Sequence, residues 1–411
     1  MTSNTTIPHK KTRRAAAHDY TRPGLYHITM HVAESLGQPL GTVAGSLEAP
    51  DGSADAPHTV LSTVGQMVEH ELLTAIHSHY PMVAIQDYVI MPEHLHFLMV
   101  VTDRLVSKNG TLQTLGHVLS GFKKGCNKRY WEMTGDSSDG QTVAHTEPSA
   151  ESSVPSGLPA RYKVPSWGTT GRQPLFAPGY CDVMPVDTAQ LATQRAYIKG
   201  NPRSRLLRMS NRAQLTVQHG AIMTVLTPAA LDGYLQRECP PSAATAEALA
   251  AIQCRLLTAA SSVPSGFPAG KVFITCDTFG KRALLTEHRC LPVVCHRKDA
   301  ARFSEQKQRC LEEAALGAIL VGTRIAPKER EIMDDAVNHG FPVITLHDNG
   351  FPDRYHPSAD RLDLCAEGRL LIVSPWKYQY RGKNEQITVL FCKAMNCVAQ
   401  ALCRTRDDWW K

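Results

Sequence analysis

Two histidines separated by a single residue, His94 and His96, have the spacing in this chain that most directly suggests chemistry. They begin the second of two apolar runs, residues 82–90 and 94–101, which flank a Met91-Pro92 turn and predict a β-hairpin. Alternate side chains of a strand share a face, so the two imidazoles would lie about 7 Å apart and could bind one divalent cation. The alternative is a pair of strand histidines that are hydrogen-bonded in or near the core.

Tyr197 is the second candidate for chemistry, on a helix predicted to begin at a capping pattern in residues 187–190. Gly200 and Pro202 are expected to end this helix. Asn201 follows Tyr197 by four residues and would share its face if the helix persists that far, although the proline after it disfavours helical angles there. Tyr197 is either a nucleophile, which would need activation because a phenol has a pKa near 10, or a packing residue of an amphipathic helix.

Basic residues accompany both of these segments. A predicted helix at residues 111–133 carries one group, and a second group follows the tyrosine; such clusters suit phosphate, although a charge run on a helix is commonly a solvated face. The residues that we expect to contact nucleic acid are Lys123, Lys124, Lys128, Arg129, Arg203 and Arg205.

The elements that must position these residues alternate between strand and helix patterns. Strands are predicted at residues 26–32, 37–45, 82–90, 94–101 and 174–184, with helices from residue 63, over 111–133 and after 187. This order predicts an α+β domain with one antiparallel sheet backed by helices over residues 23–210. Residues 46–58 form a predicted loop, and residues 135–172, rich in Ser, Gly, Pro and Thr, a predicted linker or surface insertion.

The second half of the chain has a different pattern. After a predicted connector at 211–270, residues 271–411 alternate apolar runs with helical segments near 301–316, 327–339 and 384–404, which predicts a parallel, Rossmann-like α/β sheet. Gly322-Thr-Arg324 precedes a helix and could form an anion site at its N-terminus, or a plain structural loop. The arrangement faintly resembles DprA-like nucleotide-binding or single-strand-DNA-binding domains.

Composition sets broad limits. The formal net charge of +6 is compatible with nucleic acid, and residues 1–22 are expected to be a disordered basic arm, either a solvated tail or a non-specific phosphate contact. No apolar run reaches membrane-spanning length, and the polar N-terminus does not have the pattern of a secretory signal. The 12 cysteines include no Cys-x-x-Cys pair, which argues against a zinc ribbon and suggests reduced thiols in a cytoplasmic protein.

The motifs gain specificity from their order along the chain. Met91-Pro-Glu-His-Leu-His96, Gly121-Phe-Lys-Lys124, Pro174-Leu-Phe176 with Gly179-Tyr-Cys-Asp182, and Tyr197-Ile-Lys-Gly-Asn-Pro202 succeed one another. In this combination the chain resembles the single-tyrosine HUH transposases, and within them the REP-associated tyrosine transposases. The resemblance covers roughly residues 20–210, with the predicted loop at 46–58 and the segment 135–172 as insertions.

The resemblance implies a ferredoxin-like HUH domain that cuts single-stranded DNA through a covalent phosphotyrosine. It implies His94 and His96 as ligands of Mg²⁺ or Mn²⁺, Asn201 as a polar third ligand and Tyr197 as the nucleophile, with single-stranded or hairpin DNA as partner and a possible homodimer. The Arg203-Ser-Arg-Leu-Leu207 segment departs from the family pattern. Two alternatives are a catalytically inactive hairpin-binding protein of the same fold and an unrelated metal enzyme whose site lies in the second half.

Overall fold

A computed structural model describes residues 18–135, 172–227, 272–352, 355–379 and 387–411, together with residues 229–230, 233–234, 238 and 256–257. Its contacts divide the chain into two compact units, Met1–Leu206 and Leu207–Lys411. Most of the predicted basic arm, and the predicted insertion apart from its first and last residues, lie outside the described residues.

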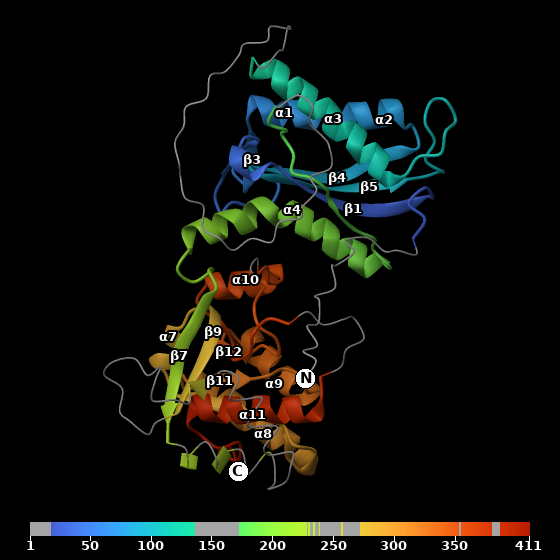
Figure 1. The fold of residues 1–411 in the computed structure, drawn as a ribbon. Helices are drawn as coiled ribbons and strands as arrows, with labels where there is room; N and C mark the ends of the chain where they lie inside the picture. The colour runs from blue at the N-terminus through green and yellow to red at the C-terminus, as the bar shows by residue number, and fades with distance from the viewer. Residues whose placement is uncertain are drawn as a thin grey trace, which may run out of the picture. The chain divides into compact units, whose positions relative to one another are not determined.

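A four-stranded antiparallel sheet forms the centre of the first unit (Figure 1). In spatial order its strands are β4 (Val83–Met91), β5 (His94–Val101), β1 (Gly24–His31) and β6 (Cys181–Val183). A separate two-stranded sheet pairs β2 (Gly41–Ala44) with β3 (His58–Leu61). The predicted strand at 37–45 therefore exists in part, but its partner is a strand that begins at the end of the predicted loop.

Helices cover both faces of the four-stranded sheet (Figure 1). One face carries α1 (Thr63–His70), η2 (Glu71–Ala75), α2 (Ile76–His79) and α3 (Leu115–Met133). The other face carries α4 (Thr188–Ser210). A short 3₁₀ turn, η1, spans Glu34–Leu36. The first unit is thus α+β with an antiparallel sheet, as the order of elements predicts.

The core of the first unit lies between the sheet and the α1–α3 layer. Leu95, Phe97 and Met99 of β5 are fully buried in it, together with Val118 and Phe122 of α3. These β5 residues alternate with His94 and His96, so the predicted division of the strand into an apolar and a histidine face is confirmed.

Helix α4 is longer than the sequence predicts. It continues through Gly200 and Pro202 to Ser210, so the predicted stop is wrong. A proline inside a helix costs about 3 kcal/mol because it removes a backbone hydrogen bond and crowds the preceding turn. Here Pro202 is buried, and the side chain of Asn201 donates to the carbonyl of Tyr197 at 2.7 Å. The burial of Pro202 and the ion pairs between α4 and the sheet offset that cost. These are contacts between distant segments, so the local sequence does not reveal them.

The second unit contains a mixed sheet, in which four adjacent strands are parallel. Its strands, in spatial order, are β10 (Cys290–Val293), β11 (Ile319–Gly322), β12 (Val343–Leu346), β13 (Leu370–Ser374), β9 (Val272–Gly280) and β7 (Gln218–Leu226), with β8 (Leu256–Leu257) paired to β9. Strands β10 to β13 are parallel, as predicted, whereas β9 is antiparallel to β13 and to β7. Because β7 and β8 lie within residues 211–270, part of the predicted connector belongs to this sheet.

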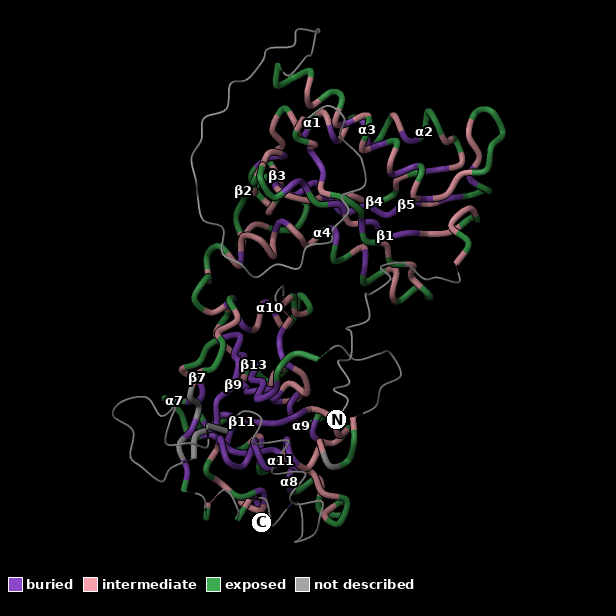
Figure 2. The backbone as a smooth tube through the Cα atoms, in the orientation of Figure 1, coloured by how far each residue is buried: buried purple, intermediate pink, exposed green. Residues whose placement is uncertain are grey.

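Helices pack on opposite faces of this second sheet. Its helical segments are α7 (Ala283–Thr286), η3 (Arg297–Arg302), α8 (Phe303–Ala315), α9 (Pro327–Asn338), α10 (Ala359–Ala366) and α11 (Val389–Cys403). Val321 of β11 packs in one core with Met395 of α11, whereas Gly322, on the other face, approaches Met333 of α9. Figure 2 shows the parallel strands buried between these layers. The Rossmann-like assignment stays a prediction.

Two sequence expectations bear on the whole chain. Within the described residues no helix is both long and apolar enough to cross a membrane. The ten cysteines in this part of the chain are free thiols, and six of them are buried.

The apolar face of β5 allows a test of the core. Replacing Phe97 by Ala should lower the free energy of unfolding of the first unit by about 3–5 kcal/mol, because it removes a fully buried ring. Hydrogen exchange at the amides of β1 and β5 during denaturation would measure this. Met133→Ala at the exposed end of α3 is the control and should change stability by less than about 0.5 kcal/mol; equal effects of the two changes would contradict the assigned core.

Candidate active site

The two predicted metal-binding histidines lie at the start of β5, directly after a two-residue turn formed by Pro92 and Glu93. Antiparallel pairing with β1 places Thr29 opposite His96 and His31 opposite His94. Opposed residues of an antiparallel pair point to the same side of the sheet. The ring centroids of His94 and His96 are 4.9 Å apart, so the structure brings this pair together as predicted.

Helix α4 brings Tyr197 to the same face. The ring of Tyr197 meets that of His96 edge to face, with a centroid distance of 5.1 Å, and lies 6.0 Å from the ring of His27. The side chain of Tyr197 is 43% exposed, whereas His96 is only 4% exposed. The tyrosine is therefore not a core packing residue: it borders solvent beside a buried histidine of its own chain.

Ion pairs with strand β4 hold α4 over this face. The register of β4 with β5 shifts between Ile85 and Tyr88, at a bulge that contains Gln86 and Asp87. Arg195 contacts both bulge side chains, with Nε 3.1 Å from the Asp87 carboxylate and Nη2 2.9 Å from Gln86 Oε1. Lys199 Nζ lies 3.7 Å from the same carboxylate. Arg195 and Lys199 precede and follow Tyr197 by two residues, so these contacts fix the turn of helix that carries the tyrosine.

His96 is oriented by a contact at its Nδ1 atom. This nitrogen lies 2.9 Å from Thr29 Oγ1 and 3.3 Å from His27 Nε2. Burial lowers the pKa of His27 to about 4, so that ring is neutral at pH 7 and can accept a hydrogen bond. With its proton on Nδ1, His96 would bind a metal ion through Nε2, which is the arrangement that outer hydrogen bonds commonly enforce on metal-binding histidines.

His94 has a comparable partner in Glu93. The Nδ1 atom of His94 lies 3.5 Å from Glu93 Oε1, and this contact, with Arg205, holds the pKa of the Glu93 carboxyl below its ordinary value. The second carboxylate oxygen, Oε2, is buried without a hydrogen-bond partner in the described residues. An unpaired buried carboxylate oxygen on the neighbour of a candidate metal-binding histidine fits a divalent cation. Sequence reasoning missed Glu93, although it is the residue directly before His94.

Asn201 lies one helical turn after Tyr197 on the continuous α4 helix. Its amide nitrogen donates to the carbonyl oxygen of Tyr197, so its carbonyl oxygen is the atom that would bind a metal. The donor set of two imidazoles with carboxylate or amide oxygens suits Mn²⁺ or Mg²⁺. His94, His96 and Tyr197 thus share one face of the sheet, with Glu93 at the edge of the group and Asn201 on the same helix as the tyrosine.

The predicted DNA-binding residues of α3 lie on the other side of the sheet, because α3 packs on the face opposite α4 (Figure 1). Lys123 is partly buried and donates to the carbonyls of Ala177 and Gly179. Arg129 pairs with Glu71 at 2.5 Å. Lys124 and Lys128 are exposed. Contact of these four residues with DNA stays a prediction, and the structure does not place them beside the histidines.

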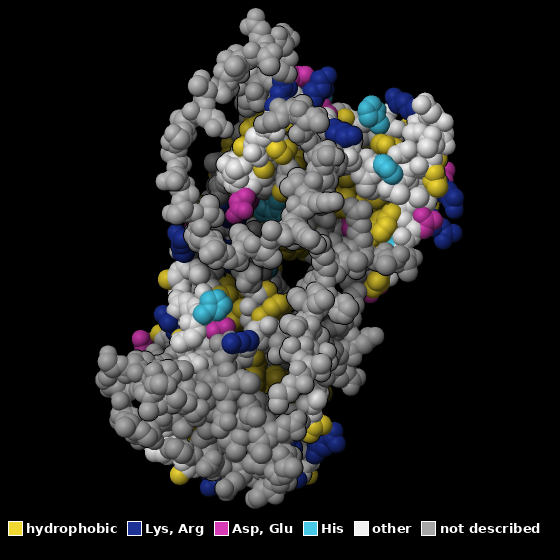
Figure 3. Space-filling model, viewed as in Figure 1, with side chains coloured by type: hydrophobic (Ala, Val, Ile, Leu, Met, Phe, Trp, Pro, Cys, Tyr) yellow, Lys and Arg dark blue, Asp and Glu magenta, His cyan; other side chains and the backbone are white. Residues whose placement is uncertain are grey.

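Arg205, on α4, lies nearer to the histidines. It pairs with Glu93 at 2.9 Å, so it is linked through that carboxylate to His94. Arg203 is partly exposed on the same helix. The space-filling view shows Lys and Arg dispersed over the visible face of the described residues and not gathered in one patch (Figure 3).

The second unit contains a group that sequence reasoning did not identify. Ligand atoms of Glu238, His296 and Asp407 all lie within 4.8 Å of one another, a spacing that could hold a metal ion. His296 Nε2 is 2.5 Å from Asp407, and Glu238 accepts from Gln400 at 2.9 Å. These hydrogen bonds also satisfy the group without a metal. No local motif could have revealed it, because its members are 58 and more residues apart in the chain.

Comparison with known proteins adds little. No protein-family profile matches the chain, and no curated protein is significantly similar to it. A solved structure of a REP-associated tyrosine transposase bound to a REP hairpin is similar over 47% of this chain and 74% of its own, at 14% identity and a TM-score of 0.24. A similarity of this level carries no argument about fold or function, so the function of this chain has to be inferred from its own residues and their geometry.

The contact between Thr29 and His96 gives a prediction about metal binding. Thr29→Val keeps the side-chain shape but removes the acceptor at Nδ1, so the affinity for Mn²⁺ should fall about 10- to 100-fold. Titration calorimetry with Mn²⁺ measures it. The control is Thr42→Val on the exposed side of β2, which should leave the affinity unchanged; an unaltered affinity in Thr29→Val would show that Thr29 does not orient His96 for a metal ion.

The buried amine of Lys123 predicts a pH dependence of stability. Burial lowers its pKa to about 8 from the ordinary 10.5. Between these values the unfolded chain keeps the proton that the folded chain has released, so the contribution of Lys123 to stability rises with pH from about 8 to about 10.5. The unfolding free energy of the wild type minus that of Lys123→Met should rise over this range. Lys128→Met removes an exposed lysine of the same helix and is the control; a curve for Lys123→Met that does not differ from the curve for Lys128→Met would contradict the lowered pKa.

Proposed function

We propose that this protein is a metal-dependent enzyme that cuts and rejoins single-stranded DNA through a covalent bond to Tyr197. The observation that carries the proposal is the position of Tyr197 on α4, with its ring 5.1 Å from that of His96, on the sheet face that also holds His94. An exposed phenol beside a buried histidine and a second, partly buried one is the combination that a tyrosine nucleophile with a metal ion requires.

The fold of the first unit supports the proposal. Its four-stranded sheet is built in the order β1, α1, β4, β5, α3, β6, which is the β-α-β-β-α-β order of a ferredoxin-like domain. This is the fold that the motifs around His94, His96 and Tyr197 imply. The second unit, with its parallel strands, is then a Rossmann-like accessory domain.

The reaction consists of two transesterifications. The Tyr197 oxygen forms a bond to phosphorus while the bond from phosphorus to the 3′ oxygen breaks; the phenol loses its proton and the 3′ oxygen gains one. A 3′-hydroxyl can later attack the phosphotyrosine and release Tyr197, so strands are joined without an external source of energy. Mn²⁺ or Mg²⁺ bound by His94 and His96, with Asn201 or Glu93 as a third ligand, would supply charge stabilisation at the scissile phosphate.

The protein's own residues position the nucleophile. Asp87 holds the turn of α4 that carries Tyr197 through its ion pairs with Arg195 and Lys199. Arg205, in its pair with Glu93, places a cation beside the proposed metal ligands and suits a backbone phosphate. Since Tyr197 faces histidines of its own chain, cleavage in this arrangement needs no second copy, and a homodimer is not required for chemistry. The partner that we propose is single-stranded or hairpin DNA.

A covalent-capture experiment tests the proposal. Labelled hairpin and single-stranded oligonucleotides are incubated with the protein and Mn²⁺ or Mg²⁺, and adducts are resolved on a denaturing gel. We expect an adduct in the wild type that falls to background with EDTA, in Tyr197→Phe and in the double change His94→Ala with His96→Ala, because nucleophile and metal are both needed.

Two matched variants serve as controls for these changes. Tyr378→Phe alters a tyrosine of similar exposure in the second unit, and His77→Ala with His79→Ala alters an exposed pair with the same spacing on α2. Both should form the adduct like the wild type. An adduct that persists in Tyr197→Phe would assign the nucleophile elsewhere, and DNA binding without any adduct would favour a hairpin-binding protein without catalysis.

A further inference from the structure

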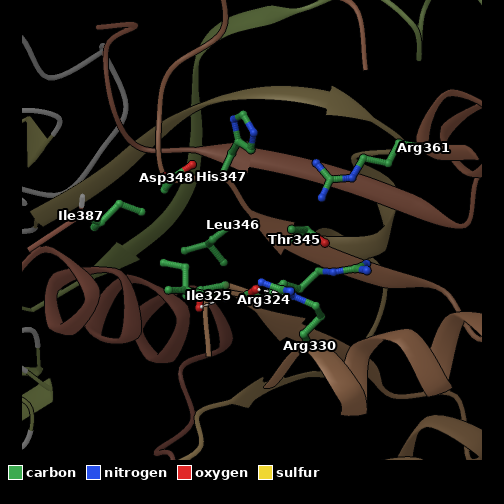
Figure 4. Close-up of a pocket in the computed structure, with 10 residues that line it drawn as sticks. Arg324, Ile325, Arg330, Thr345, Leu346, His347, Asp348, Arg361 and Ile387 are labelled. Atoms are coloured by element: carbon green, nitrogen blue, oxygen red, sulfur yellow. Dashed lines mark hydrogen bonds between the residues drawn. The ribbon is translucent and has the colours of Figure 1, made fainter. Parts of the chain in front are cut away.

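A cavity of about 410 Å³ lies at the carboxyl ends of two parallel strands in the second unit, β11 and β12. Its lining combines the loop after β11, the loop after β12 and residues of α9 and α10, as Figure 4 shows. The carboxyl edge of a parallel sheet is the place where α/β proteins form ligand sites, and the volume lies in the range of pockets for small molecules.

Three arginines from three different segments line this cavity. Arg324 belongs to the loop after β11, Arg330 to α9 and Arg361 to α10 (Figure 4). One carboxylate, Asp348, belongs to the lining itself, and two more lie next to it: Asp334, which pairs with Arg324, and buried Glu329, which accepts from Thr323. Among the lining residues themselves there are thus three arginines and one carboxylate, and a cavity that gathers guanidinium groups from separate elements favours an anionic ligand.

The arginines keep hydrogen-bonding capacity for a ligand. Within the described residues, the hydrogen bonds and ion pairs of these side chains are those of Arg324 with Asp334 and of Arg330 Nε with the carbonyl of residue 324 at 3.4 Å, and Arg361 lies near the Tyr355 hydroxyl. A guanidinium has five N–H donors, and these contacts use only part of them. Planar, bidentate donor pairs of this kind match the oxygens of a phosphate group.

The loop that carries Arg324 is held in place by hydrogen bonds to the buried side chain of Glu329. Buried Glu329, in the first turn of α9, accepts from the Thr323 hydroxyl at 2.6 Å and from the backbone N–H of Cys295 at 3.2 Å. Arg324 itself adopts a left-handed backbone conformation, with φ of 57°, which non-glycine residues seldom occupy. Pro327 begins α9 directly after the loop, so the positive end of the helix dipole faces the same region. The arginine is thus presented by a fixed loop.

The remaining lining suits an organic group attached to the anion. Ile325, Leu346 and Ile387 provide apolar surface, while Thr345 and His347 provide hydrogen-bonding groups. We propose that this cavity binds a phosphorylated ligand of nucleotide size, with the phosphate held by Arg324, Arg330 and Arg361. This site belongs to the second unit and is independent of the DNA cleavage proposed for the first. A free nucleotide and the 5′-phosphate end of a short DNA strand offer the same chemistry.

Titration calorimetry with the full-length protein at low salt tests this inference. The probes are inorganic pyrophosphate, ADP, and pentathymidylate with and without a 5′-phosphate; EDTA is present throughout, so that metal-dependent binding at His94 and His96 does not contribute. We expect the wild type to bind at least one phosphorylated probe and each of Arg330→Gln and Arg361→Gln to weaken that binding at least about tenfold. Arg330 is exposed, so its replacement leaves folding intact even if that of Arg361 does not.

Arg297→Gln is the matched control, since Arg297 is an exposed arginine of the same unit outside the cavity. Its binding should stay within twofold of the wild type. Tighter binding of ADP than of the phosphorylated strand would identify a free nucleotide as the source of the phosphate, and the reverse would identify a DNA end; both support the site. Absence of binding by every phosphorylated probe, or an equal loss in Arg297→Gln and Arg330→Gln, would overturn it.

Discussion

The antiparallel pairing of β1 with β5 is the constraint on which the first unit depends. Its register sets Thr29 against His96 and His31 against His94, and it sends Ile28, Met30 and the alternate residues of β5 into the core. A slip of one residue would exchange the two faces, burying imidazoles against α3 and exposing a large apolar surface. Burial of the apolar face therefore fixes the position of the histidines more firmly than any polar contact in the site.

The tyrosine depends on a second set of contacts, which joins α4 to the opposite face of the sheet. A bulge in β4 presents Asp87 to Arg195 and Lys199, and Glu93 in the adjacent turn pairs with Arg205. Each of these pairs is partly exposed and individually weak, but they act on one continuous helix and so restrain it together. The same helix continues through the buried Pro202. Because the helix is continuous there, Asn201 stays one helical turn from Tyr197.

In the second unit, helices bury the parallel strands on both faces of the sheet. These strands lie between α9 on one side and α11 on the other. Two polar groups are found in its described residues: the arginine-lined cavity at the carboxyl ends of β11 and β12, and the Glu238, His296 and Asp407 group, in which His296 follows β10 and Asp407 follows α11. Neither includes a residue of the first unit, so each unit carries its own polar group.

The sequence by itself determined the local features: the hairpin with His94 and His96 on one face, the helix that carries Tyr197, and the alternation of strands and helices after residue 271. These follow from periodicities within a few residues, which local physics sets. Only the tertiary structure decided that α4 continues through Pro202 and that β9 runs antiparallel to β13. It also decided that Lys123 donates hydrogen bonds to two backbone carbonyls, and that Glu93 and Thr29 contact the histidines. These features depend on contacts between distant segments, in which burial and ion pairs outweigh local preference.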